Sequence, residues 1–184
     1  MRLGLLTAPF PDTSLGEVAD WSSANGFESL EIACWPPSTG PSRRYAGTSH
    51  IDVSDLSAER AREIVDEIAA KGLSISGLGY YPNPLHPERE HRERVIGHLK
   101  LVIEAAGRMG VGLVNTFIGG DAAKTTDANW ERALEIWPGI VSHARDYGVK
   151  ITIENCPMIF TDDEWPGGHN IAWSPYIWRR IIGQ

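Results

Sequence analysis

The sequence contains few cysteines and no long apolar segment. Its two cysteines, Cys34 and Cys156, make no disulfide framework, and we expect both to be packing residues in a reducing compartment. No apolar run approaches the roughly 18 residues that a membrane-spanning helix needs. The N-terminus also lacks the layout of a signal peptide. The sequence thus predicts a cytoplasmic protein without a membrane partner.

Basic residues and nucleotide-binding motifs are scarce as well. With 17 Lys and Arg against 24 Asp and Glu, the formal net charge is −7, whereas nucleic-acid binding requires concentrated positive charge. No Gly-x-Gly-x-x-Gly motif follows the first predicted strand, and there is no phosphate-loop lysine motif. No nucleophile elbow is recognisable either. These absences argue against a nucleic-acid partner, against nucleotide-binding folds and against covalent acyl transfer.

Strand and helix patterns alternate regularly along the chain. The predicted strands are 2–7, 28–33, 73–79, 112–118 and 149–154, and the predicted helices are 14–25, 57–71, 87–109, 127–147 and 174–182. Five such βα units require a parallel sheet with right-handed crossovers, either an open doubly wound sheet or a TIM-type barrel. Carboxylates and amides at the strand ends favour the barrel, whose typical size of roughly 250 residues exceeds this chain. We predict one domain over 1–184, an α/β TIM-type barrel that is incomplete in this chain.

The predicted helix 127–147 contains a proline and an apolar stripe. The spacing of Leu134, Trp137, Val141 and Ala144 predicts that these four residues face the core. Pro138 lies inside the pattern, which indicates a kink or a break.

The segment 150–157, Lys-Ile-Thr-Ile-Glu-Asn-Cys-Pro, carries the strongest functional signal. It has the pattern of a buried strand in which Ile151 and Ile153 share one face, while Thr152 and Glu154 share the other. A glutamate at the carboxyl end of a barrel strand lies where such folds keep their chemistry. A carboxylate buried there needs a metal ion or a cationic partner, so Glu154 is a candidate ligand or base, with a structural salt bridge as the alternative.

Several other polar or aromatic residues follow strands or lie in the two long predicted loops, 34–55 and 155–173. Each has a structural alternative: Glu31 a structural carboxylate, His86 a helix cap, Asn115 a core amide, His169 loop packing, and Trp35 a cover over the barrel end. These alternatives remain open from the residues alone.

Four segments together resemble the sugar phosphate isomerase/epimerase family, the xylose isomerase-like TIM barrels that also include inosose dehydratases and endonuclease IV. The matching segments are Gly79-Tyr80-Tyr81-Pro82-Asn83-Pro84-Leu85-His86-Pro87, Asn115-Thr116-Phe117-Ile118-Gly119, Ile153-Glu154-Asn155-Cys156-Pro157-Met158 and Asn170-Ile171-Ala172-Trp173-Ser174-Pro175. The resemblance covers essentially the whole chain.

This resemblance implies an isomerase or epimerase that transfers a proton at the carbon beside a sugar carbonyl. Glu154 takes the position of a ligand to a divalent metal, manganese or magnesium, and of an acid/base group. The substrate, a small sugar, would contact residues Glu31, Trp35, His86, Asn115, Asn155 and His169. The family's other ligands, an aspartate, a histidine and a second glutamate, come from later strands, so the ligand set is incomplete in this chain.

Two alternatives follow from the same observations. The first is a lyase or a nuclease of the same fold, although the net negative charge disfavours the nuclease. The second is a truncated, non-catalytic module that binds a ligand or assembles with another copy. Half of a barrel exposes two sheet edges and apolar surface, so such a chain is expected to form a homo-oligomer or to aggregate.

Overall fold

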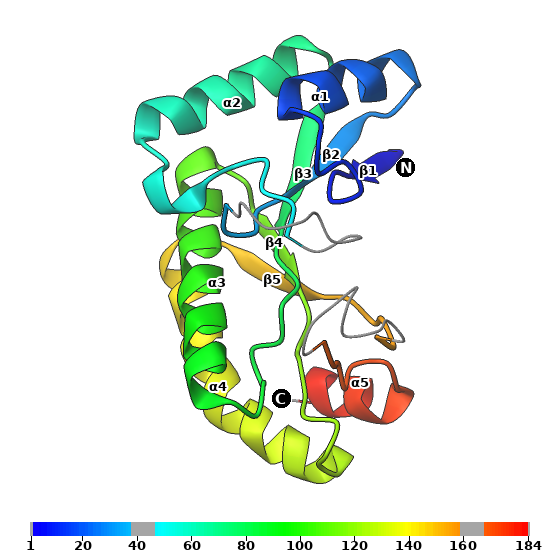
Figure 1. Cartoon of the computed structure of the whole chain (residues 1–184), viewed down its shortest axis with the longest axis vertical. Coiled ribbons are helices and arrows are strands. Elements are labelled where there is room, and N and C mark those ends of the chain that lie inside the picture. The colour runs from blue at the N-terminus through cyan, green and yellow to red at the C-terminus, as the bar shows by residue number, and fades with distance from the viewer. Residues whose placement is uncertain (1, 38–46, 159–167, 184) are drawn as a thin grey trace.

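The computed structural model describes residues 2–37, 47–158 and 168–183 and contains the five βα units expected from the sequence (Figure 1). The remaining segments, 38–46 and 159–167, belong to the two long predicted loops and lie outside the described residues. The strands are β1 (Gly4–Leu6), β2 (Ser29–Ala33), β3 (Ser74–Gly79), β4 (Leu113–Thr116) and β5 (Lys150–Ile153). The helices are α1 (Leu15–Ala24), the short η1 (Val53–Asp55), α2 (Ala58–Ala70), α3 (Arg89–Met109), α4 (Thr126–Asp146) and α5 (Pro175–Ile182).

The sheet topology is that of a TIM-type barrel. All neighbouring strands are parallel, and their order in the sheet, β1-β2-β3-β4-β5, is the order of the sequence. A doubly wound sheet would instead reverse its order at a switch point. No pairing between β1 and β5 occurs among the described strands, so the barrel is not closed in this chain. The predicted fold class is therefore confirmed.

Local signals fix the ends of the helices. At the start of α1, the Ser14 hydroxyl accepts a hydrogen bond from Glu17 N (3.3 Å), and the Glu17 carboxylate accepts one from Ser14 N (3.0 Å). At the start of α5, the Ser174 hydroxyl accepts a hydrogen bond from Ile177 N (3.4 Å), and Pro175 takes the first helical position. At the other end of a helix, Gly110 stops α3 in the left-handed conformation, with φ of 69°.

Two glycine-to-alanine substitutions at α3, one at its C-terminal end and one inside it, are expected to have opposite effects on stability. Gly110→Ala should lower the free energy of unfolding by about 1 kcal/mol, because an L side chain is strained at this φ. Gly97→Ala, inside the exposed face of the same helix with no atom near its Cβ, should raise it by about 0.5–1 kcal/mol. Urea denaturation midpoints measure both, and equal shifts of the same sign would contradict this account of the helix end.

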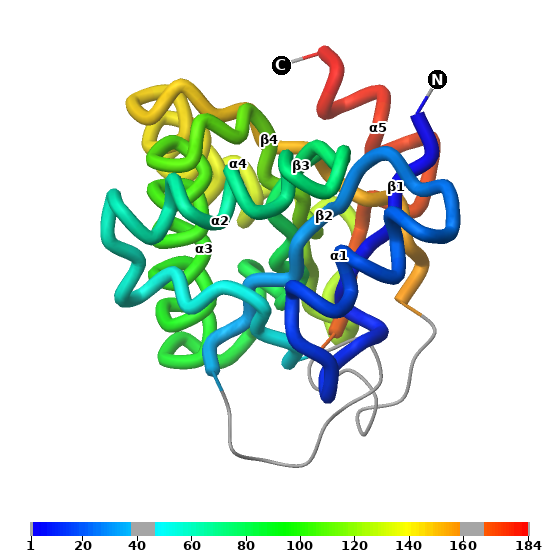
Figure 2. The backbone as a smooth tube through the Cα atoms, turned by 90° about the horizontal axis from the view of Figure 1, so that it is seen from above, coloured from blue at the N-terminus to red at the C-terminus, as the bar shows by residue number. Residues whose placement is uncertain are grey.

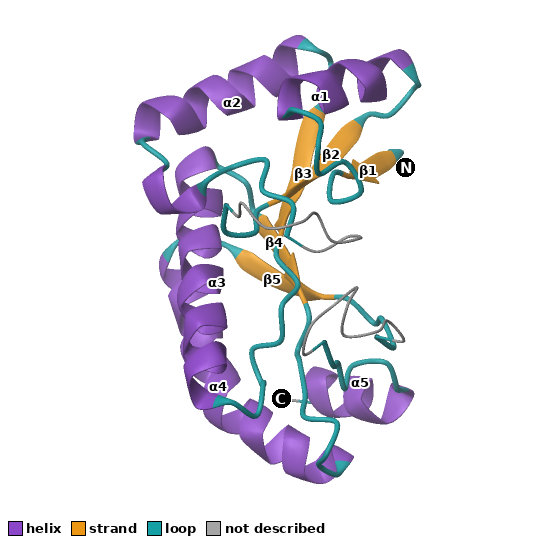
Figure 3. Cartoon of the chain, viewed as in Figure 1, coloured by secondary structure: helices purple, strands orange, loops and turns teal. Residues whose placement is uncertain are grey.

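The main core lies between the sheet and helices α2, α3 and α4, which run along one side of it (Figure 3). Leu30, Ile32, Leu78 and Val114 of the strands are fully buried, as are Leu99, Val102 and Ile103 of α3. Figure 2 shows α2 and α3 next to each other on this outer side. The outward strand residues thus pack under the helices, and the alternate residues, including Glu31, face the other way.

A second, smaller cluster packs α5 against the loop after β4 and the start of α4. Its members are Leu85, Ile118, Trp130, Ala133, Ile171, Ala172 and Ile177. This cluster holds the C-terminal segment 168–183 near the carboxyl ends of the strands (Figure 1). No helix among the described residues is both long and apolar enough to cross a membrane.

The predicted inward face of α4 is wrong in two of its four residues. Leu134 and Val141 are 44% and 53% exposed, whereas Trp130, Ala133 and Ile140 are buried. Apolar residues occupy adjacent positions along this helix, so two stripes about 100° apart both satisfy helical spacing. The stripe that includes Trp130 is the one that packs, and the larger apolar surface of a tryptophan favours its burial.

Two expectations about local regularity also need correction. The helix α4 continues through Pro138, so of the predicted kink or break the break does not occur. The strand β5 is half-exposed rather than buried, since Lys150 and Thr152 are exposed and β5 pairs only with β4 among the described strands.

Candidate active site

The inner face of the sheet carries polar side chains at the carboxyl ends of β2, β4 and β5. Between them, β3 contributes two glycines. A Cβ on Gly79 would lie 2.6 Å from Oε1 of Glu31, and one on Gly77 would lie 2.9 Å from Nδ2 of Asn115. Because neither glycine has a side chain, the Glu31 side chain of β2 and the Asn115 side chain of β4 can lie over β3.

Hydrogen bonds join these side chains into one chain across four elements. The Tyr81 hydroxyl donates to the carboxylate of Glu31, and the Thr152 hydroxyl donates to Oδ1 of Asn115. The Asn115 side chain also lies close enough to Glu31 to lower the pKa of that carboxyl group, which brings the two pairs together. Each member fixes the orientation of the next, so the arrangement is organised before any ligand binds.

The electrostatics of this face are those of two carboxyl groups without a counter-ion. Burial raises the pKa of Glu31, and the hydrogen bonds from Tyr81 and Asn115 lower it in part. Glu154 is exposed, and not buried as the sequence predicted. Partial loss of solvent around its carboxyl group still raises the pKa of Glu154, and the negative charge of Glu31 adds to that rise. Among residues 2–37, 47–158 and 168–183, no Lys, Arg or His forms an ion pair with either group. The salt-bridge alternative for Glu154 thus has no partner in the part of the chain that is described.

Backbone contacts fix the position of Glu154 just after β5. Its N–H donates to the carbonyl of Thr116 (2.9 Å), which continues the β4–β5 ladder by one residue. The fully buried Asn170 donates to the carbonyls of Glu154 (2.9 Å) and Cys156 (3.1 Å). Asn170 therefore connects the segment before α5 to the end of β5.

A second buried amide, Asn83, connects the loops after β3 and β4. Its Nδ2 donates to the carbonyl of Gly120 (2.6 Å), and its Oδ1 accepts from Gly120 N (2.9 Å) and Leu85 N (3.0 Å). The reasoning from sequence assigned no role to Asn83, Asn170 or Tyr81 individually. The signal was present, since all three lie in the segments that carry the family resemblance.

The predicted site residues fall into three groups. Glu31, Asn115 and Glu154 lie together on the inner face, as described above. His169 lies over the loop after β4, because a Cβ on Gly120 would be 2.5 Å from its Cδ2. Asn155 is exposed at the end of β5.

Trp35 and His86 contact other parts of the structure. Trp35 is 5% exposed, and its ring packs at 5.8 Å from that of Tyr80 and 5.9 Å from that of Tyr81. The Trp35 ring thus packs against Tyr81, whose hydroxyl donates a hydrogen bond to Glu31. The ring of His86 lies 4.2 Å from that of His91 at the start of α3. The structure does not bring His86 into the hydrogen-bonded chain of the inner face.

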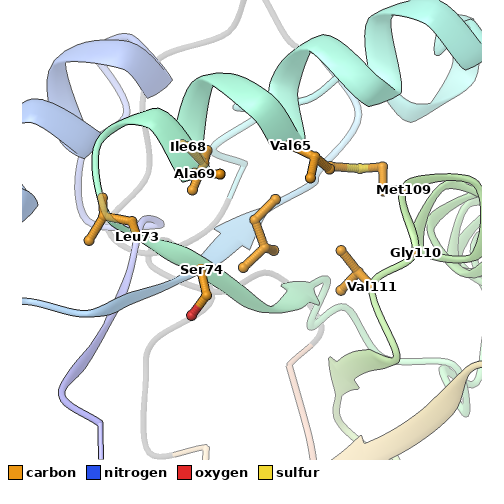
Figure 4. A pocket seen from close by; sticks show the side chains of 9 residues that line it. Val65, Ile68, Ala69, Leu73, Ser74, Met109, Gly110 and Val111 are labelled. Carbon is orange, nitrogen blue, oxygen red and sulfur yellow. The ribbon is translucent and has the colours of Figure 1, made fainter.

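An apolar cavity lies at the opposite end of the strands. It has a volume of about 240 Å³ and is lined by residues of α2, by the start of β3 and by the end of α3, among them Val65, Ile68, Leu73 and Met109 (Figure 4). In barrels of this type, the amino ends of the strands serve stability and the carboxyl ends carry the chemistry. The candidate active site is therefore the group Glu31, Asn115 and Glu154, and not this cavity.

Comparisons with known proteins agree with this fold. A family model described as a xylose isomerase-like TIM barrel matches residues 19–182. None of the curated proteins matches the chain.

Solved structures with the same fold include several sugar enzymes. A D-psicose 3-epimerase from Clostridium cellulolyticum, with D-tagatose, is 18% identical with a TM-score of 0.62, over 89% of this chain and 54% of that one. A putative xylose isomerase from Rhodospirillum rubrum is 19% identical with a TM-score of 0.63, over 86% and 55% of the two chains. A probable 3-DHS dehydratase from Bacillus anthracis is 16% identical with a TM-score of 0.63, over 85% and 53%. At these identities the likeness establishes the fold alone, and the chain spans about half the length of these proteins.

Proposed function

The chain belongs to the xylose isomerase-like TIM barrel family, and on this premise we propose that the protein is a divalent-metal-dependent isomerase or epimerase of a sugar or sugar phosphate. One observation carries the proposal: the carboxyl group of Glu31, on the inner face of β2, lies close enough to that of Glu154, just after β5, for its negative charge to raise the pKa of Glu154. The sugar epimerases and isomerases among the similar structures support the same class of reaction.

The residues present fit one part of a metal site. Glu154 offers a carboxylate oxygen, no described basic residue pairs with it, and the neighbouring Glu31 destabilises its negative charge. A divalent cation would relieve both effects, and hard oxygen donors select magnesium or manganese. Such a cation, when bound, supplies positive charge to the substrate oxygens as the neighbouring C–H loses its proton. The other ligands expected from the family are not among these residues.

In this proposal Glu154 moves the proton and its neighbours hold the substrate. A raised pKa brings the carboxyl group nearer to the operating pH, where a group can both accept and return a proton. Glu31 and Asn115 present acceptor and donor groups to the substrate hydroxyls. Tyr81 and Thr152 keep those two side chains in place through the hydrogen bonds described above. His169, Asn155 and Trp35 remain proposed contacts at the rim.

Metal removal tests the cofactor in this proposal. The protein is dialysed against a chelator and assayed on a panel of ketoses and their phosphates, with and without added Mn²⁺ or Mg²⁺. Isomerised or epimerised product is expected only with the added ion, because the two carboxyl groups alone lack a counter-ion. Full turnover by chelated protein without any ion would exclude the metal-dependent reaction.

A lyase is the second candidate, favoured by the probable dehydratase among the similar structures. It uses the same first step, removal of a proton beside a carbonyl, but then loses a hydroxyl group as water. The same substrate panel distinguishes the isomerase from the lyase, since only a lyase produces an unsaturated product.

The cytoplasmic location and the homo-oligomer stay predictions.

A further inference from the structure

Three side chains outside the active site converge at the start of α3. They are His86 in the loop after β3, Glu88 at the N-cap position of the helix, and His91 in its first turn. The ligand atoms of all three lie within 4.8 Å of one another, and the two imidazole rings lie with their centroids 4.2 Å apart and their planes tilted by 36°. Figure 1 shows this end of α3 below the sheet, on the side of the strands' carboxyl ends.

The backbone that carries these side chains is fixed by other contacts. His86 N donates to the carbonyl of Asn83 (3.3 Å), which is itself held by the bonds to Gly120. Arg92 donates to the carbonyls of His86 (2.6 Å) and Pro87 (3.2 Å). Because the loop is ordered without a ligand, binding an ion there costs little conformational entropy.

None of the three side chains forms an ion pair among the described residues. Of the other charged residues in these turns, Arg89 pairs with Glu93 (2.7 Å) and Arg94 with Glu90 (2.9 Å), whereas Arg92 donates to the backbone as described above. Glu88 makes no side-chain capping bond. His86 Nδ1 accepts a long hydrogen bond from Glu88 N (3.2 Å), so this nitrogen carries a lone pair and no proton, and a metal ion bound there would replace that hydrogen bond.

The donor set indicates which class of ion would bind. Two imidazoles and one carboxylate match the ligands of zinc and similar borderline cations, whereas magnesium prefers oxygen alone. Zinc bonds of about 2.0–2.1 Å in a tetrahedron place ligand atoms roughly 3.4 Å apart, so small side-chain rotations bring these three into range. The remaining position would be open to water.

We infer that His86, Glu88 and His91 form a second metal site, specific for a zinc-type divalent cation and separate from Glu154. An ion there would clamp the loop after β3 to the first turn of α3. That loop carries Tyr81, which binds Glu31. The inference does not depend on the proposed isomerase activity, because it assigns a binding site and no reaction.

Cobalt(II) titration of the chelator-treated protein tests this site. Cobalt replaces zinc in tetrahedral sites and gives visible d–d absorption there, which added Zn²⁺ should abolish. His91→Gln and Glu88→Gln should each weaken cobalt and zinc binding, by more than about tenfold. Because both positions lie on the surface side of the helix start, both variants are expected to fold. Circular dichroism checks this expectation.

Two control variants separate this site from other ligands. His143→Gln removes an imidazole that contacts Glu104 on another part of the protein, and Glu154→Gln removes the proposed ligand of the active site. Both should keep the cobalt absorption. Absorption that survives His91→Gln and Glu88→Gln, or that is lost in Glu154→Gln instead, would overturn the inference, as would a zinc dissociation constant weaker than about 1 mM.

Discussion

Glu154→Gln is expected to lower kcat by about 10²–10⁴-fold while leaving the fold intact. The amide cannot accept the substrate proton, and loss of a positioned acid/base group has an effect of this size. Steady-state kinetics on the substrate found by the metal-dependent screen measures the change. Glu135→Gln, at an exposed carboxylate of α4, is the matched control and should leave kcat unchanged. Equal kcat values in wild type and Glu154→Gln would remove Glu154 from the chemistry.

The same variant is expected to become more stable near neutral pH. The folded-state pKa of Glu154 lies above its ordinary value, so the folded protein binds more protons than the unfolded chain between the two pKa values. Stability therefore falls as pH rises through the folded pKa, and the neutral amide removes that loss. Urea midpoints for the metal-free protein should be higher for Glu154→Gln than for wild type above that pKa. The stability curves of wild type and Glu154→Gln should converge at acid pH. A substitution that lowers activity while raising stability is typical of a functional residue.

Glu31→Gln is expected to move the acid side of the pH–rate profile to lower pH. The negative charge of Glu31 contributes to the raised pKa of Glu154, so its removal lets the pKa of Glu154 fall. Glutamine still offers Tyr81 an acceptor oxygen, which preserves the hydrogen bond on that side. The measurement is kcat against pH, in wild type and variant, at saturating Mn²⁺ or Mg²⁺.

A carboxylate outside the site provides the control for this shift. Glu135→Gln removes one negative charge from the exposed side of α4 and should leave the acid side of the profile in place. An unchanged profile in Glu31→Gln would show that the two carboxyl groups do not interact. A shift to higher pH would contradict the sign of the effect.

The sequence predicted the features that depend on local pattern. Alternation along 150–154 placed Glu154 directly after β5, and Ser174 followed by Pro175 marked the start of α5. Strand order followed from repeated βα units. These signals are local, because backbone geometry and capping act within a few residues.

Features that depend on distant contacts could not be predicted in this way. Asn83 and Asn170 connect loops through side-chain bonds to Gly120 and Glu154, and no spacing in the sequence marks such bonds. Which face of α4 is buried depends on which of its two apolar stripes packs better against the core. The bond between Tyr81 and Glu31 joins residues 50 positions apart and required the parallel pairing of β2 and β3 to be known.

In the proposed reaction, Glu154 exchanges a proton at the carbon beside a sugar carbonyl, in the presence of a divalent cation. The most direct measurement is the uptake of solvent deuterium at that carbon, followed by NMR in D₂O with Mn²⁺-exchanged or Mg²⁺-loaded protein. The account predicts incorporation by wild type and by Glu135→Gln, and none above background by Glu154→Gln. Deuterium uptake at equal rates in Glu154→Gln and wild type would contradict it.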